Sequence, residues 1–133
     1  MKKLLSILIV FTFAVIIVSG CSKSDDTTIT NTGGNQLPTS PSSPIPSNGA
    51  VGVTGFVTAT WSCSDPDVND TLRYDVYIGS TTNPSTVVTT GTLNKAADLG
   101  IAGPNTLVYW KVVAKDNHGG VTNGPVWSYR TAP

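Results

Sequence analysis

The chain has 133 residues, which is room for one ordinary domain, and its formal net charge is zero. Charged residues make up only 12% of it, and it contains no glutamate. Without Lys2 and Lys3 at the N-terminus, six basic residues face eight acidic ones. This slightly acidic balance, with no basic stripe, argues against nucleic acid as a partner. Frequent Thr and Val favour strands, and frequent Gly, Asn, Pro and Ser favour turns, so the composition indicates an all-β domain.

The first twenty residues have the pattern of a secretory signal peptide. Lys2 and Lys3 give a positive start, residues 4–18 form an almost wholly apolar run, and the small residues Ser19 and Gly20 follow. The run is shorter than the roughly 20 residues that a membrane span needs. We therefore predict that residues 1–20 are a signal peptide that is removed.

The four residues Val18-Ser19-Gly20-Cys21 resemble the lipobox of bacterial lipoproteins. The resemblance implies cleavage before Cys21, a diacylglycerol on its thiol and an acyl chain, such as palmitate, on its new amino group. Several acyl chains hold a protein firmly at a membrane, because each buried methylene contributes about 0.8 kcal/mol. No other cofactor is expected.

The residues after Cys21 resemble the start of Bacteroidetes surface lipoproteins. Ser22 is not the aspartate of the common inner-membrane retention signal, and Asp25 and Asp26 form a short acidic cluster like the export signal of that group. This resemblance implies an outer-membrane lipoprotein exposed at the cell surface. A solvated, charged start of a tether is the alternative interpretation.

Residues 21–44 are predicted to form a flexible tether of Ser, Thr, Pro and Gly. Ile29 and Leu37 are the large apolar residues in its Thr27–Pro44 part. Such a segment buries too little surface to offset the entropy lost on ordering. The folded domain is therefore expected to span residues 45–133.

Seven short segments in the domain alternate between apolar and polar residues and are separated by turn residues. They are residues 50–53, 56–63, 72–78, 86–90, 96–101, 106–115 and 126–131. The alternation places one set of side chains in the core: Val57, Ala59, Trp61, Cys63, Leu72, Tyr74, Val76, Ile78, Val108, Trp110, Val112, Ala114, Trp127 and Tyr129. Seven strands in about 90 residues are typical of a two-sheet sandwich.

Several of these segments resemble a fibronectin type III domain. The resemblance is carried by Trp61, by residues 72–77 (LRYDVY), by residues 108–114 (VYWKVVA) with Asp116 and Gly119-Gly120 behind them, and by residues 125–131 (PVWSYRT). It implies a seven-stranded, immunoglobulin-like β-sandwich, but no particular function. Val108 stands where the family usually has a corner tyrosine, so Tyr109 points outward unless the register shifts by one residue. That shift would expose Trp110.

Catalysis is not expected. The single histidine, His118, lies in a turn-rich stretch with no nucleophile motif beside it, so we predict that the protein is not an enzyme. Cys63, the second of the two cysteines, is expected to be buried.

Three aspartates cluster in the loop after Cys63. Asp65, Asp67 and Asp70 are a candidate calcium site, because calcium takes several oxygen ligands at once. The alternative is a turn in which the aspartate side chains accept bonds from nearby backbone amides.

The outward sides of the third, sixth and seventh segments carry the candidate binding residues: Arg73, Tyr77, Tyr109, Lys111 and Arg130. Aromatic side chains beside charged groups suit protein or sugar recognition. We therefore expect a non-catalytic, membrane-anchored interaction module with an accessory or adhesion role toward a protein partner. A polysaccharide-binding lipoprotein and a passive spacer are the alternatives.

Overall fold

The computed structural model describes residues 34–133, which form nine strands and no helix. The predicted signal peptide, Cys21 and the first part of the predicted tether lie outside these residues. In the described part, no helix could cross a membrane. The strands are β1 (Ser42–Ile45), β2 (Ala50–Val53), β3 (Val57–Ser62), β4 (Arg73–Gly79), β5 (Thr86–Thr92), β6 (Ala96–Gly100), β7 (Leu107–Lys115), β8 (Val121–Asn123) and β9 (Trp127–Thr131).

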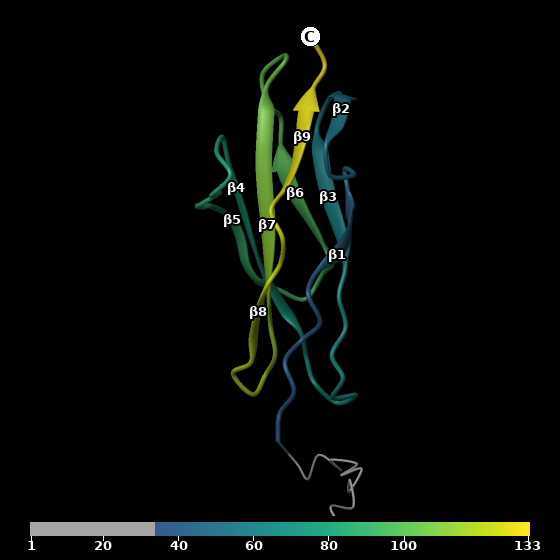
Figure 1. The fold of residues 1–133 in the computed structure, drawn as a ribbon, viewed down its shortest axis with the longest axis vertical. Helices are drawn as coiled ribbons and strands as arrows, with labels where there is room; N and C mark the ends of the chain where they lie inside the picture. The colour runs from purple at the N-terminus through teal and green to yellow at the C-terminus, as the bar shows by residue number, and fades with distance from the viewer. Residues whose placement is uncertain (1–33) are drawn as a thin grey trace, which may run out of the picture. The chain divides into compact units, whose positions relative to one another are not determined.

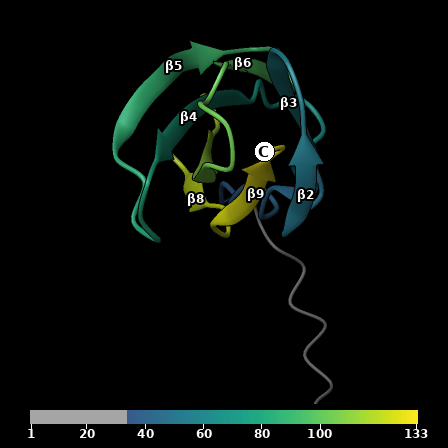
Figure 2. The same cartoon turned by 90° about the horizontal axis from the view of Figure 1, so that it is seen from above.

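Two sheets pack face to face around one core (Figures 1 and 2). The smaller sheet has the order β1-β3-β6, and the larger has the order β2-β9-β7-β4-β5, with β8 added beside the second half of β7. The pairing is antiparallel except between β2 and β9. The predicted all-β sandwich is confirmed. All seven predicted strands are present, and β1 and β8 are additional.

The core consists of the side chains that the alternation placed inward. Two aromatic pairs lie at its centre: Trp110 with Trp127, whose ring centroids are 4.7 Å apart, and Trp61 with Tyr74, which meet edge to face at 5.4 Å. Burial raises the pKa of the Tyr74 hydroxyl above its ordinary value. The predicted register of β7 is confirmed, because Val108, Trp110, Val112 and Ala114 are all buried.

Two side chains that were predicted to point to solvent are buried instead. Asp75 and Val113 lie opposite each other on β4 and β7, and Asn123 of β8 flanks Val113 on its other side. Asp75 is covered by the Lys115 side chain of β7 and the Gly91 amide of β5, contacts that alternation within one strand does not reveal.

The domain begins earlier than residue 45, so the predicted tether is wrong for residues 35–44. Thr39 donates its amide to the Ser64 carbonyl at 2.8 Å, and its Oγ1 accepts the Ser64 amide at 2.9 Å. Thr122 donates its hydroxyl to the Pro38 carbonyl at 2.7 Å, and both Pro38 and Pro41 are buried. Proline loses less conformational entropy on folding and supplies apolar ring surface, so this segment needs no large apolar side chain to pack.

Replacing Trp110 with alanine tests the register of β7. Trp110 is fully buried, so we expect the free energy of unfolding in urea to fall by about 3–5 kcal/mol. Tyr109→Ala, one residue away on the other face, should cost no more than about 1 kcal/mol. A larger loss for Tyr109→Ala than for Trp110→Ala would mean that the register is shifted by one residue.

Candidate interaction face

The candidate binding residues lie on the solvent side of the larger sheet, on strands β4, β7 and β9. The strand pairing brings Arg73 opposite Lys115, Tyr77 opposite Lys111, and Tyr109 opposite Ser128. We call this outward surface the β4–β7–β9 face. Its side chains belong to Arg73, Asp75, Tyr77, Leu107, Tyr109, Lys111, Val113, Lys115, Ser128 and Arg130.

Tyr77, Lys111 and Tyr109 form the centre of this face. The Lys111 ammonium lies 5.3 Å from the centroid of the Tyr77 ring, within the range of a cation–π contact. Tyr109 is two residues along β7 on the same side, opposite Gly79, against which Pro84 packs. All three side chains are partly exposed. The structure therefore brings together three of the five predicted residues.

Arg73 and Arg130 lie at opposite ends of the face. Arg73 pairs with Lys115 and Arg130 with Leu107, positions that are roughly 25 Å apart along β7 at the rise of a β-strand. Arg73 Nη1 donates to the Gly91 carbonyl at 3.0 Å, and Arg130 Nη1 donates to the Asn105 carbonyl at 3.1 Å. The two arginines border the face rather than joining the central cluster.

Asp75 also lies on this face, although it is not one of the five predicted binding residues. It is 4% exposed, yet it is charged. Burial opposes its ionisation, but the bond and charge of the Lys115 ammonium and the Gly91 amide, which donates at 2.9 Å, together hold the Asp75 pKa below its ordinary value. Gly91 has a φ of +65°, so a residue with a side chain would be strained there.

Positive charge is concentrated on the β4–β7–β9 face. Of the five Lys and Arg residues in the described part of the chain, Lys95 is the one that lies elsewhere. Asp75 is the single carboxylate on the face; the other described carboxylates lie in the loops or on β6. The net charge conceals this separation, and only the pairing of β4, β7 and β9 reveals it.

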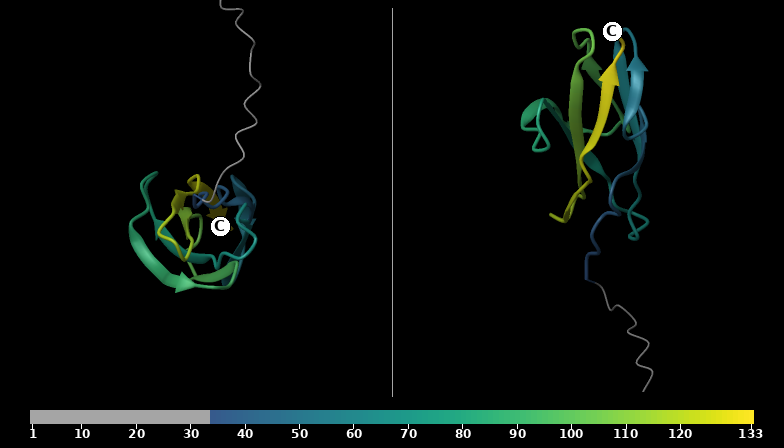
Figure 3. Two further views of the ribbon diagram at one scale, coloured as in Figure 1. Left: turned by 90° about the horizontal axis from the view of Figure 1, so that it is seen from below. Right: turned by 45° about the horizontal axis from the view of Figure 1, so that its top comes forward.

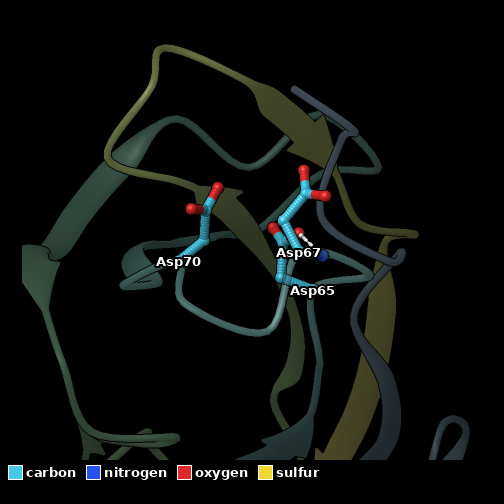
Figure 4. Close-up of side chains that lie close together, drawn as sticks. All are labelled: Asp65, Asp67 and Asp70. Atoms are coloured by element: carbon cyan, nitrogen blue, oxygen red, sulfur yellow. Dashed lines mark hydrogen bonds between the residues drawn. The ribbon is translucent and has the colours of Figure 1, made fainter. Parts of the chain in front are cut away.

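The three loop aspartates come together, as Figure 4 shows. One carboxylate oxygen from each of Asp65, Asp67 and Asp70 lies within 4.8 Å of the others. The Asp67 amide donates to Asp65 Oδ1 at 2.9 Å, so the backbone turn of the alternative interpretation is also present. The Gln36 amide donates to Asp67 Oδ2 at 2.7 Å.

His118 lies beside this loop, a contact that the sequence did not reveal. Its Nδ1 is 3.0 Å from the Asp70 carboxylate, and this bond, together with the negative charge, raises the pKa of His118. The Asp116 carboxylate holds the turn by accepting the amides of His118 at 2.8 Å and Gly120 at 2.7 Å. These contacts link the loop before β4 to the turn after β7.

Cys63 is buried, as predicted. Its thiol donates to the Thr39 carbonyl at 3.2 Å, so it takes part in the attachment of the N-terminal segment.

Comparison with known proteins identifies likeness in structure only. No protein-family model and no curated protein matches the chain. A Streptomyces avermitilis α-L-rhamnosidase, solved with L-rhamnose, is similar with a TM-score of 0.50 and 19% identity over 72% of this chain. The match spans 10% of the rhamnosidase chain, so it concerns one domain of that protein.

The fibronectin type III domain of human fibronectin type III domain containing protein 3 is also similar. The TM-score is 0.49 and the identity 20%, over 77% of this chain and 93% of that domain. At such low sequence identity, structural similarity concerns the fold alone. A fold of this kind hosts many unrelated functions.

Removing the amino group of Lys115 tests the buried charge on the face. In Lys115→Met, Asp75 keeps the Gly91 amide but loses its counter-charge. We expect about 1–3 kcal/mol of destabilisation at pH 7, less than for a fully buried pair because the Lys115 side chain is 43% exposed. Urea unfolding measures this, with Lys111→Met as the control on the same strand and face.

The pH dependence of the same variant has a definite sign. Because the folded-state pKa of Asp75 lies below its ordinary 3.8, its ion pair stabilises the wild type above that pH, and this stability is lost as the pH falls through the folded value. In Lys115→Met the Asp75 pKa should rise, and ¹³C NMR of the carboxyl carbon measures it. An unchanged Asp75 titration would show that Lys115 does not set its charge.

Proposed function

We propose that this chain is a non-catalytic interaction module, anchored in the outer membrane through lipid on Cys21 and displayed at the cell surface. The anchor is supported by the signal-peptide pattern and the lipobox-like residues 18–21, and display by Asp25 and Asp26. A β-sandwich of this kind is typically a non-catalytic scaffold, and the single histidine contacts an aspartate in a surface loop.

The observation that supports the module best is the β4–β7–β9 face. It combines two partly exposed tyrosines with four cations in a chain that is otherwise acidic. Tyrosine and arginine are enriched at protein interfaces, and complementary charge directs association. We therefore propose an acidic surface of another envelope protein as the partner, with the chain as its accessory or adhesion subunit.

A polysaccharide ligand is the second candidate. It is favoured by Tyr77 and Tyr109, two partly exposed aromatic rings on the same face. Partly exposed aromatic rings beside hydrogen-bonding groups suit the recognition of a sugar. A passive spacer is the third candidate, and it needs no ligand on the face.

Crosslinking on intact cells tests the proposed partner. A tagged full-length copy should yield one recurrent crosslinked protein, lost at high salt and in the double variant Tyr77→Ala/Tyr109→Ala. Phe56→Ala is the matched control, because Phe56 is a 60% exposed aromatic just before β3, in the other sheet, and its loss should change nothing. If the double variant still crosslinks to the same partner, the β4–β7–β9 face is not the binding surface. If no protein is captured, binding to a polysaccharide panel would favour the second candidate, and no binding would favour the spacer.

Replacing Cys21 with serine tests the anchor separately. The wild-type chain should be recovered with outer membranes and labelled by a palmitate analogue. The Cys21→Ser chain should lose the label and its lipoprotein processing. Cys63→Ser is the control, since the Cys63 thiol is buried, and it should keep the label. Labelling that persists in Cys21→Ser would show that the lipid is elsewhere.

A further inference from the structure

The loop between β3 and β4 brings three carboxylates together, of which His118 contacts one. Oδ2 of Asp65 is fully buried and has no hydrogen-bond partner among the described residues. In Figure 4, one Asp65 oxygen bonds to the Asp67 amide and the other lies on the side of Asp70. A buried, unpartnered carboxylate oxygen costs free energy unless a cation or a donor reaches it.

The other two carboxylates surround the same point. The Asp70 side chain is 3% exposed and bonds to the His118 ring, and Asp67 is oriented by the Gln36 amide. No Lys or Arg among the described residues forms an ion pair with any of the three aspartates. Lys95 lines a hollow together with the three aspartates, but it donates to the Cys63 carbonyl at 2.5 Å.

We propose that Asp65, Asp67 and Asp70 bind a calcium ion. Their nearest oxygens lie within 4.8 Å of one another, and oxygens on opposite sides of a calcium ion are about 4.6–5.2 Å apart. An all-oxygen set with three carboxylates suits calcium, whereas magnesium usually keeps several waters and one or two carboxylates. A separate open hollow of about 460 Å³, lined by Asp67, Asp70 and His118 but not by Asp65, gives solvent access to two of the three aspartates.

Calcium bound at this site would also stabilise the N-terminal segment of the domain, residues 35–44. Gln36 donates its amide and, at 3.3 Å, its side chain to the carboxylate of Asp67, and Thr39 bonds to Ser64 at the start of the loop. Figures 1 and 3 show this segment and the loop at the same end of the domain. Calcium would therefore slow hydrogen exchange at Gln36 and Thr39.

The test uses the full chain, purified in detergent and freed of divalent ions with EDTA. Equilibrium dialysis with radioactive calcium should give one ion per chain, with a Kd of about 10⁻⁴–10⁻³ M, the range of extracellular calcium modules. At 10 mM CaCl₂ the Tm should rise by about 5–20 °C, and at 10 mM MgCl₂ by less than a third of that.

Asp65→Asn separates calcium binding from a turn-forming role. The asparagine oxygen can still accept the Asp67 amide, so in EDTA the variant should melt at or above the wild-type Tm, because a repulsive charge is gone. The rise in Tm with calcium should be lost in this variant. The control Asp98→Asn changes an aspartate on β6, outside the loop, and should keep that rise. The proposal is overturned if the wild type binds no calcium, if magnesium acts equally, or if Asp65→Asn responds like the wild type. Because the dialysis uses the wild-type chain, it decides the question even if the variant does not fold.

Discussion

The burial of one side of β7 in the core is the constraint on which the rest of the domain depends. β7 is the longest strand and pairs with β4, β8 and β9, and its Trp110 packs on Trp127. Side chains alternate along a strand, so burying Trp110 and Val112 sends Tyr109 and Lys111 to the opposite side. The packing of the core thus positions the interaction residues, which need no contacts of their own to be presented together.

This dependence also explains what the sequence could and could not predict. Period-two alternation predicted the seven strands and the core of the sandwich, because each strand carries that pattern locally. The packing of residues 35–44 was not predictable in the same way. The hydroxyls of Thr39 and Thr122 donate to the carbonyls of Ser64 and Pro38, and such contacts carry no periodic signal. The three loop aspartates were recognisable because they lie close in sequence. The burial of Asp75 was not, because it depends on the neighbouring strands.

The cations of the β4–β7–β9 face are held in place before any partner arrives. Arg73 and Arg130 bond to backbone carbonyls at the two ends, Lys115 pairs with Asp75, and Lys111 lies over Tyr77. Long side chains normally lose conformational entropy when a partner fixes them, and prior positioning reduces that cost. Asp75 neutralises one cation, but it is buried, so the exposed groups remain positive toward an approaching acidic surface.

The carboxylate loop and the positive face are neighbours along the chain, which links the two proposals electrostatically. Asp70 precedes Arg73 by three residues, about 10 Å of extended chain. Three carboxylates lie near the Arg73 end of the face, and a bound calcium ion would add two positive charges beside them. That distance is comparable to the Debye length at physiological salt, so the change would reach Arg73 but would be largely screened at Arg130. Calcium would therefore act mainly on the part of the face next to the N-terminal segment.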